Sequence, residues 1–292
     1  MLRCAVFLLC VFAAGCVIAE NLPRTEYKDI PYYSETAREK ADDYQKSQCK
    51  VKISVPKETE GAKLPVLVWF HGGGLTGGSL EYPGGGKSQT LIMNEKIILI
   101  GAGYRLSPKA DFPAFIEDAA AATAWTFANI EKYGGDTKKI FIGGMSAGGY
   151  LSGMVGLDPQ WLAPYKIVNK KLAGIIIQSG QVTTHYHVKA ILPQKYPKPR
   201  YQPVIDENAP LFYLSKDAPP ILLTTGDREL DMPARVQENE LMYASLKALE
   251  HPSVEFYEHK GYDHGKVASS PESFERIKNF IKKTVPAPPL TE

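Results

Sequence analysis

Short apolar runs alternate with amphipathic stretches from Cys49 to the end of the chain. Residues 50–55 alternate between polar and apolar positions, a pattern that predicts a β-strand. Five further runs are almost entirely apolar, as expected for parallel strands that are buried on both faces. These runs are Val66–Phe70, Ile97–Ile100, Ile140–Ile142, Gly174–Gln178 and Ile221–Thr225, and Val254–Glu258 is expected to form a last strand.

Segments with helical spacing separate these strands. Pro113–Lys132, Pro233–Leu249 and Pro271–Lys283 are predicted helices, each with proline at or near its start, and Ser34–Gln48 predicts a short charged helix ahead of the sheet. The repeated strand–helix–strand order predicts an α/β fold with a mostly parallel, doubly wound sheet flanked by helices. Pro193–Pro210 interrupts this order and is expected to form a short, loop-like cap, because it lacks the residues for a core of its own.

The first 19 residues have the pattern of a secretory signal peptide. The positive start Met1–Arg3 precedes the uncharged stretch Cys4–Ala19, which is shorter than the roughly 20 residues of a membrane span. Cleavage after residue 19 fits an ordinary signal peptidase. Cleavage after residue 15 would follow a bacterial lipoprotein box and leave Cys16 as a lipidated N-terminus that anchors the protein to a membrane. Both alternatives predict export, to the periplasm or out of the cell.

The remaining chain is predicted to hold one domain at residues 49–285, after an N-terminal extension at 20–48 and before a flexible tail at 286–292. Of the four cysteines, the mature chain is expected to keep Cys49, and Cys16 only if it is lipidated, so no internal disulfide framework is expected. Hydrophobic residues make up 44% and charged residues 23%, which excludes a disordered chain, a collagen and a multi-span membrane protein. The net charge of +2, without a basic stripe, argues against nucleic acid as a partner.

A glycine-rich motif follows the strand that ends at Ile142. Gly144–Gly148 reads G-x-S-x-G with Ser146 at its centre, and a segment rich in small residues continues from it as a predicted helix. A nucleophile exposed on a sharp strand-to-helix turn needs small neighbours on both sides. The N–H of Ala147 would open the helix and face developing negative charge.

A second glycine run follows the strand Val66–Phe70 directly. His71–Gly74 reads H-G-G-G, and consecutive glycines allow the main chain to approach a substrate carbonyl. Backbone N–H groups held in this way stabilise an oxyanion, and the loss of one such donor costs about 2.7–4 kcal/mol. The two motifs together predict acyl transfer at Ser146.

The combination resembles the α/β-hydrolases of the hormone-sensitive-lipase-like and feruloyl-esterase-like carboxylesterase group. The resemblance covers roughly residues 49 to 284. It implies an α/β-hydrolase fold and a serine esterase that uses no cofactor, with an oxyanion hole from Gly73, Gly74 and Ala147 and with Gly72 mainly forming the turn. The matching segments are His71–Gly74, Tyr104–Pro108, Phe112–Pro113, Glu117–Asp118, Tyr133–Asp136 and Gly144–Gly149.

The base is expected after the last strand, where Gly261–Gly265 carries His264 between two turn glycines. His259, which ends that strand, is the second candidate. The acid is expected in the segment 226–231, and the family's usual spacing, three positions after a small residue, selects Glu229. The family more often has Asp at that position, so Asp227 and then Asp231 stay open; the alternative role of Asp231 is a helix N-cap ahead of Pro233.

No metal or cofactor is expected from the remaining motifs. Gly84–Ser88 lacks the first glycine of a phosphate loop, and Gly101–Gly103 lacks the third glycine of a dinucleotide fingerprint. His185 and His187 have no companions at metal-ligand spacing. Two other functions fit the same residues: a serine peptidase of the oligopeptidase type, for which the 48 residues before the sheet leave no room for an accessory domain, and a non-catalytic ligand-binding protein on a hydrolase scaffold.

The insert from Val182 to Pro210 is too short for a broad helical lid. It favours short-chain or carbohydrate-linked esters, including those of polysaccharides, over emulsified fat. Aromatic residues of the insert and its surroundings either line the acyl site as a wall or pack the proline-rich loop; these residues are Tyr186, Tyr196, Tyr201 and Phe212. The oligomeric state is not encoded in any of these patterns.

Overall fold

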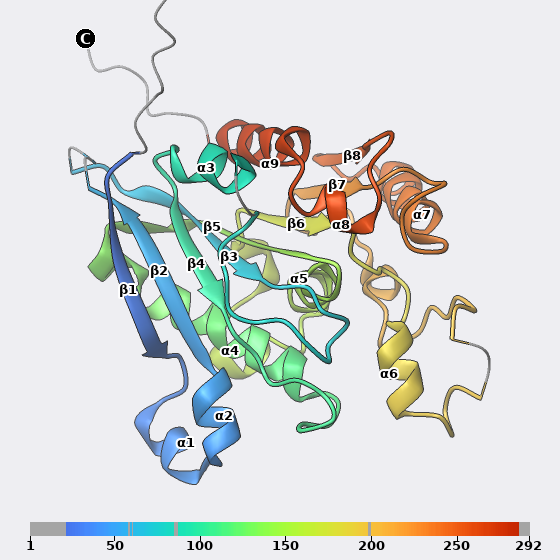
Figure 1. The fold of residues 1–292 in the computed structure, drawn as a ribbon, viewed down its shortest axis with the longest axis horizontal. Coiled ribbons are helices and arrows are strands. Elements are labelled where there is room, and N and C mark those ends of the chain that lie inside the picture. The colour runs from blue at the N-terminus through green and yellow to red at the C-terminus, as the bar shows by residue number, and fades with distance from the viewer. Residues whose placement is uncertain (1–21, 58, 60, 85–86, 198–199, 286–292) are drawn as a thin grey trace, which may run out of the picture.

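The computed structural model describes residues 22–57, 59, 61–84, 87–197 and 200–285; the predicted signal peptide and the predicted tail lie outside them. The described residues form one eight-stranded sheet in the order β1-β2-β4-β3-β5-β6-β7-β8 (Figure 1). The strand β2 runs antiparallel to both of its neighbours, and all other pairs are parallel. The strands are β1 (Arg24–Pro31), β2 (Lys50–Pro56), β3 (Leu64–Phe70), β4 (Ile98–Ala102), β5 (Gly135–Met145), β6 (Gly174–Gln178), β7 (Ile221–Thr225) and β8 (Val254–Glu258).

The predicted α/β architecture is confirmed, and the structure adds a strand to it. β1 lies within the segment expected as an N-terminal extension and pairs with β2 at the edge of the sheet. Its sequence RTEYKDIP is rich in charge, and half of its residues are exposed while the others are partly buried, which is typical of edge strands and hides it from a search for apolar runs. β5 is also longer than the apolar core Ile140–Ile142, because its first residues are polar and partly exposed.

Helices cover both faces of the sheet (Figure 1). α4 (Ala114–Asn129) and α5 (Ala147–Leu157) lie on one face, and α3 (Lys87–Met93) and α9 (Pro271–Thr284) lie on the other. α7 (Arg235–Ala248) packs on β7 and β8. The predicted charged helix at Ser34–Gln48 is two short helices, α1 (Glu35–Lys40) and α2 (Asp43–Gln48), because Asp42 interrupts the run by capping the second with its side chain.

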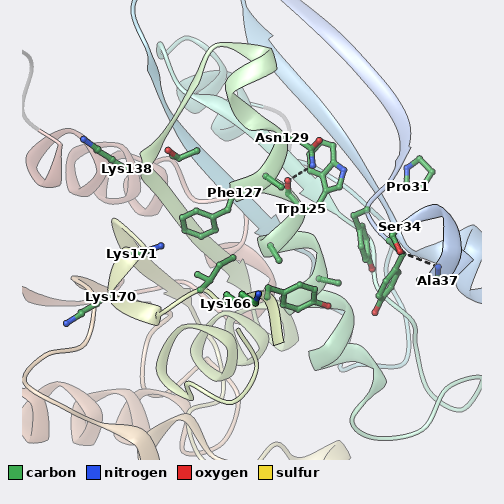
Figure 2. Close-up of a pocket in the computed structure, with 18 residues that line it drawn as sticks. Pro31, Ser34, Ala37, Trp125, Phe127, Asn129, Lys138, Lys166, Lys170 and Lys171 are labelled. Carbon is green, nitrogen blue, oxygen red and sulfur yellow. Dashed lines mark hydrogen bonds between the residues drawn. The ribbon is translucent and has the colours of Figure 1, made fainter. Parts of the chain in front are cut away.

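The insert after β6 contains α6 (Tyr186–Ile191), and a short helix α8 (His264–Val267) follows β8. Short 3₁₀ turns complete the chain: η1 (Ile130–Tyr133), η2 (Ala163–Tyr165), η3 (Asn169–Lys171) and η4 (Pro210–Tyr213). A broad hollow of about 1320 Å³ lies between the end of α4, the start of α1 and the connection from α5 to β6 (Figure 2).

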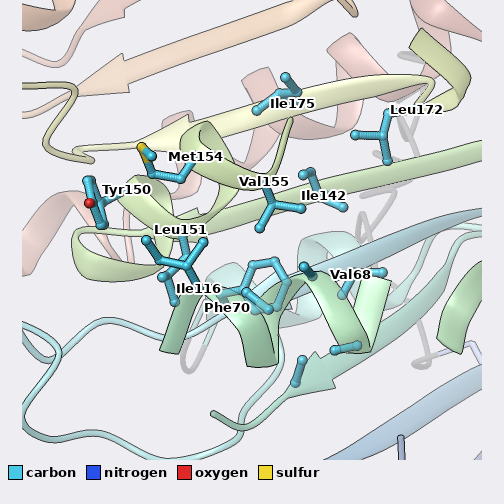
Figure 3. Packing of buried hydrophobic residues seen from close by; sticks show 14 of the residues in the cluster. Val68, Phe70, Ile116, Ile142, Tyr150, Leu151, Met154, Val155, Leu172 and Ile175 are labelled. Carbon is cyan, nitrogen blue, oxygen red and sulfur yellow. The ribbon is translucent and has the colours of Figure 1, made fainter. Parts of the chain in front are cut away.

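Alternate residues of the central strands point to opposite faces of the sheet. Val66, Val68 and Phe70 of β3 belong to the cluster formed with α4 and α5, which Figure 3 shows around Leu151 and Val155. Leu67 and Trp69 face the second cluster, in which α9 supplies four buried residues: Phe274, Ile277, Phe280 and Ile281. The two buried layers fix the register of β3 and β5, and therefore the positions of the loops at their carboxyl ends.

Local packing settles the expectation for Cys49. Cys49 is a free, buried cysteine between α2 and β2, as expected for a structural residue, and burial raises the pKa of its thiol. Within the described part of the chain, no helix combines the length and the apolar character that a membrane crossing requires.

Candidate active site

Ser146 lies in the turn between β5 and α5, with φ 56° and ψ −114°. A positive φ is strained for a residue with a side chain, and such strain persists only where the surroundings impose it. A Cβ on Gly144 would lie 2.4 Å from the carbonyl carbon of Gly148, and a Cβ on Gly148 would lie 1.9 Å from the carbonyl oxygen of Phe70. The two glycines therefore let the turn press against the end of β3 and hold the serine at the carboxyl end of β5.

His264 reaches Ser146 from the loop after β8. Its Nε2 lies 2.9 Å from Ser146 Oγ, and its Nδ1 lies 2.6 Å from Asp231 Oδ1. The imidazole thus stands between a hydroxyl and a carboxylate, 118 and 33 positions away in the chain. This is the arrangement that a serine nucleophile, a general base and an orienting acid require.

Asp231 is fully enclosed, with none of its side chain exposed. Besides His264, its carboxylate accepts hydrogen bonds from Ser179 Oγ at 2.5 Å and from the N–H groups of Gly226 and Met232 at 2.7 Å each. Burial alone would raise the pKa of this carboxyl, but the hydrogen bonds from His264 and Ser179 outweigh burial and lower it. The group is therefore held as a carboxylate against the imidazole.

The structure corrects the choice of Glu229 as the residue that faces the imidazole. The chain turns after Gly226: Asp227 Oδ1 accepts from the N–H of Glu229, and the N–H of Asp231 donates to the carbonyl of Asp227 at 2.8 Å. This turn leaves Glu229 exposed at its apex and returns Asp231 to the sheet edge. A carboxylate at the first position of such a turn bonds its own backbone, so a spacing counted along an extended chain fails here.

Asp231, the third candidate acid, is the carboxylate that the structure places on His264, whereas Asp227 has other partners. Asp227 Oδ2 accepts from the N–H of Gly261 at 2.8 Å, and its own N–H donates to the carbonyl of Tyr262, so it ties the loop after β7 to the loop that carries His264. The pKa of Asp227 is lowered by the backbone N–H groups of Glu229 and Gly261. Asp231 is no helix cap, because α7 begins at Arg235 with Ala234 as its N-cap.

The glycine run after β3 lies beside the serine. A Cβ on Gly72 would lie 3.6 Å from Ser146 Cβ, while Gly73 and Gly74 have φ 117° and 64° and curl the loop. The carbonyl of Gly73 accepts from the N–H groups of Thr76 and Gly77. Within the described part of the chain, no hydrogen bond to another residue uses the N–H groups of Gly73, Gly74 or Ala147. These amides are therefore available to an oxyanion.

His71 supports the loop and does not take part in the hydroxyl–imidazole–carboxylate chain. The His71 ring is buried and stacks on Tyr104 at 4.2 Å, and its Nδ1 lies 2.7 Å from the carbonyl of Gly72. Tyr104 Oη donates to the backbone carbonyl of His71. Burial lowers the pKa of His71, which favours its neutral form. His259, the second candidate base, is buried at the end of β8, with its ring 6.3 Å from that of Tyr262.

Two further residues lie near the site: Ser179, which the sequence did not single out, and Tyr186, which was predicted among the aromatic residues. Ser179, with φ 46°, follows β6 and places its hydroxyl 3.1 Å from His264 Nδ1 as well as on Asp231. Tyr186 on α6 brings its hydroxyl to the oxyanion loop, 2.5 Å from where a Cβ on Gly74 would lie. Ser179 lies in no recognisable motif. Its position directly after the buried strand β6 is the one sequence feature that could have suggested a place near the site.

The predicted aromatic residues divide into two groups. The ring of Tyr201 lies 6.4 Å from that of Tyr186, and the Arg200 guanidinium lies 4.1 Å above the Tyr186 ring. Tyr196 instead donates its hydroxyl to Asp206 within the insert, and Phe212 is exposed against Tyr213. Only the first pair lies near the oxyanion loop.

His185 and His187 lie side by side on the insert without forming a metal site. His185 is buried and stacks on Tyr186 at 4.4 Å, and its Nδ1 accepts from the N–H of His187. Among the described residues, no group of three or more His, Cys, Asp or Glu side chains is placed to hold a metal ion.

Comparison with known proteins points to one group. The BD-FAE family model matches residues 51–192. Esterase LipC of Mycobacterium tuberculosis is 27% identical over 224 residues, which cover 72% of this chain and 55% of LipC. A second esterase of the same organism, LipI, is 36% identical over 100 residues, and there the match spans 31% of the relative. The chain thus spans about half, or less, of the length of these curated relatives.

Solved structures share the fold over nearly the whole described chain. A truncated carbohydrate esterase from gut microbiota has a TM-score of 0.65 at 18% identity and covers 91% of this chain and 98% of its own. The chain therefore has the α/β-hydrolase fold, and its sequence is similar to the BD-FAE family over residues 51–192 and to the esterase LipC.

Proposed function

We propose that this protein is a serine carboxylesterase that hydrolyses short-chain or carbohydrate-linked esters through an acyl-enzyme. The observation that carries the proposal is the continuous chain of hydrogen bonds from Ser146 Oγ through His264 to the buried carboxylate of Asp231, beside the unpaired amides of Gly73, Gly74 and Ala147.

The first half of the reaction forms the acyl-enzyme. Ser146 Oγ attacks the ester carbonyl carbon while His264 Nε2 takes the hydroxyl proton. Asp231 holds the imidazole by its Nδ1–H and stabilises the charged form. The carbonyl oxygen becomes an oxyanion that accepts from the backbone amides, and each donor is worth about 2.7–4 kcal/mol in the transition state. The imidazolium then protonates the leaving alcohol as the C–O bond breaks.

The second half of the reaction hydrolyses the acyl-enzyme and regenerates the free enzyme. Water replaces the alcohol, His264 takes one of its protons, and the resulting hydroxide attacks the acyl carbon. The same backbone N–H groups donate hydrogen bonds to the second oxyanion. His264 then returns its proton to Ser146 Oγ as the carboxylic acid leaves. Every proton transfer in this cycle uses the same Nε2, so a single imidazole orientation serves both halves.

The surroundings of the serine favour small or sugar-linked esters. In its described part, the insert between β6 and β7 consists of the six-residue α6, the short turn η4 and loops, and Tyr186 lies against the oxyanion loop. Aromatic rings such as Tyr186 and Tyr201 pack well against sugar faces and phenolic acyl groups. Among the structural relatives are the carbohydrate esterase from gut microbiota and a bifunctional GH43-CE protein of Bacteroides eggerthii, which has a TM-score of 0.67 at 20% identity and covers 89% of this chain and 38% of its own.

Turnover on three substrates tests this proposal. Rates are compared on acetylated xylan, methyl ferulate and nitrophenyl acetate, with Ser146→Ala as the blank. Hydrolysis of all three with preference for one of the first two supports a carbohydrate esterase. Hydrolysis of nitrophenyl acetate alone supports a short-chain esterase and contradicts the proposal that carbohydrate-linked esters are substrates. If none of the three esters is turned over, hydrolysis of a peptide nitroanilide identifies a peptidase, and no hydrolysis of that amide either identifies a binding protein.

We further propose that the protein is exported by its first 19 residues, which lie outside the described structure. The support is the charge-free apolar stretch behind a basic start. Intact mass of the protein isolated from its producing cells separates the two cleavage sites: an N-terminus at Glu20 indicates ordinary cleavage, and a diacylglycerol adduct on Cys16 indicates a lipid anchor. A mass that includes Met1 contradicts export.

A further inference from the structure

The broad hollow in Figure 2 belongs to neither the catalytic residues nor their loops. It is formed by the end of α4, the segment leading into α1, the first residues of β5 and the connection from α5 to β6. Lys138 marks its place on β5, seven residues before Met145 and the serine turn. At about 3.3 Å per residue, these seven steps separate the hollow from the active site by roughly 23 Å.

The lining of the hollow carries charge of one sign. It includes Lys138, Lys166, Lys170 and Lys171 and no aspartate or glutamate. All four lysines are exposed, and none forms an ion pair with another residue in the described part of the chain. Figure 2 shows Lys138, Lys170 and Lys171 along one side and Lys166 nearer the middle. Four exposed lysines without an ion-pair partner among the described residues, on a concave surface, attract anions, since a cleft focuses the field of its walls.

Aromatic surface accompanies the lysines. Tyr165 is 41% exposed beside Lys166, and Trp125 lines the opposite side of the hollow (Figure 2). A concave patch that combines apolar area with a few charged groups is typical of a binding site. The flat faces of such rings pack against the C–H faces of sugar rings, while the lysines suit carboxylates.

The hollow continues into a second one. A neighbouring depression of about 600 Å³ shares Lys166, Ile167 and Lys170 with the first and extends it toward Tyr213 and Ala218. The lining of the second hollow includes Asp217, so the uninterrupted positive lining belongs to the first hollow, and the two together offer room for several linked units of a ligand.

We infer that this hollow is a second binding site for a polysaccharide chain that carries uronate carboxylates. The four lysines indicate that the ligand is anionic. The aromatic faces, together with the proposed function, indicate that it is a carbohydrate. Binding here would hold a polymeric ester near the enzyme while its acyl groups reach the distant Ser146. Neutral glycans, nucleic acid and anionic membranes are the competing occupants.

Binding of polygalacturonate tests the inference. Full-length Ser146→Ala protein is used, so that no ester chemistry enters the result, and affinity is measured at low ionic strength by calorimetry. The expected result is binding that the triple variant K138Q/K166Q/K170Q weakens at least tenfold and that Y165A weakens to a smaller degree. Binding should also weaken as salt rises. Neutral arabinoxylan should bind more weakly and should be insensitive to the lysine changes.

The matched control is K28Q/K57Q/K247Q, which removes the same charge from exposed lysines outside the hollow. It should change the affinity less than twofold. Absence of binding, equal losses in both triple variants, or tighter binding of duplex DNA or phosphatidylglycerol vesicles at equal anion concentration would each overturn the inference. Failure of the esterase proposal leaves this measurement intact, and loss of polygalacturonate binding leaves nitrophenyl acetate hydrolysis intact.

Discussion

The two ends of strand β5 carry two different kinds of surface. At its carboxyl end, Ser146 and His264 are backed by an Asp231 side chain that is fully enclosed and accepts four hydrogen bonds. Near its amino end, Lys138 and the other lysines of the hollow are exposed and lack ion-pair partners within the described chain. The catalytic geometry thus rests on a buried carboxylate with all its hydrogen-bond partners in place, whereas binding capacity comes from exposed lysines without ion-pair partners among the described residues.

The difference predicts how each region responds to substitution. Groups in the catalytic chain act as one unit, so the loss of one member removes most of the rate. Lysines on an open surface act through a screened field, so each contributes little and the effect follows their number.

The largest effect is expected at the nucleophile. Ser146→Ala should lower kcat on nitrophenyl acetate by about 10⁶-fold, the loss seen when a triad serine is removed. The thermal transition should stay close to that of the wild type, because the substitution removes only one oxygen. A purified variant that keeps ordinary esterase activity would show that Ser146 is not the nucleophile.

The next effect separates the three carboxylates after β7. Asp231→Asn should lower kcat by about 10⁴-fold, because an amide presents the wrong partner to His264 Nδ1–H. Glu229→Gln should stay close to wild type, since this side chain is exposed at the apex of the turn. Kinetics of both variants on one substrate decide the assignment, and the reverse ranking would restore Glu229 as the acid.

The oxyanion loop should respond at an intermediate level. Gly74→Ala places a Cβ 2.5 Å from Tyr186 Oη at a φ of 64°, so the loop and its N–H donors must shift. We expect a loss of about 10²–10³ in kcat, comparable with the loss of one oxyanion donor. Gly134→Ala is the control, because its φ is also positive, at 82°, but a Cβ there meets nothing within 4 Å. Equal kinetic losses in both variants would mean that backbone strain alone is responsible.

The free energy of unfolding at acidic pH should depend on the ionisation of the Asp231 carboxylate. The pKa of Asp231 is lowered in the folded chain from its ordinary value of 3.8, so Asp231 stabilises the fold above that pH and loses this contribution as pH falls through the lower folded value. The difference in unfolding free energy between wild type and Asp231→Asn should be constant at neutral pH and should shrink below about pH 4. Denaturant titrations across this range measure it, and a difference that grows on acidification contradicts the prediction.

The smallest effect is expected for the lysine substitutions when activity is measured on a small substrate. K138Q/K166Q/K170Q should change kcat/KM on nitrophenyl acetate less than twofold, because the hollow lies roughly 23 Å from the serine along β5. A tenfold loss would show that the hollow and the catalytic residues are coupled.

Both regions also show how far a sequence can be interpreted. Every predicted strand exists, because buried parallel strands consist of apolar residues that stand out in the sequence. Strand β1 was not predicted, because this edge strand is rich in charged residues. Ser146 and His264 could be selected because each lies in a glycine-bounded segment directly after a strand. Asp231 could not be separated from Glu229, since a turn closed by the side chain of Asp227 decides which carboxylate returns to the sheet.

The lysine hollow had no sequence signature at all. Its lining comes from four separate parts of the chain, and the net charge of +2 conceals a local group of four positive side chains. Only the packing of α4 against the connection that follows α5 brings these residues to one surface. Ser179 is similar, because its contact with Asp231 depends on two loops that are 52 positions apart.

Labelling with a fluorophosphonate, followed by peptide mapping, tests the central claim most directly. The account predicts one covalent adduct on Ser146 in the wild-type protein, and much slower labelling when Asp231 is replaced by Asn. An unlabelled wild-type protein, or an adduct on the neighbouring Ser179 instead, would contradict the assignment of Ser146, His264 and Asp231 as one catalytic unit.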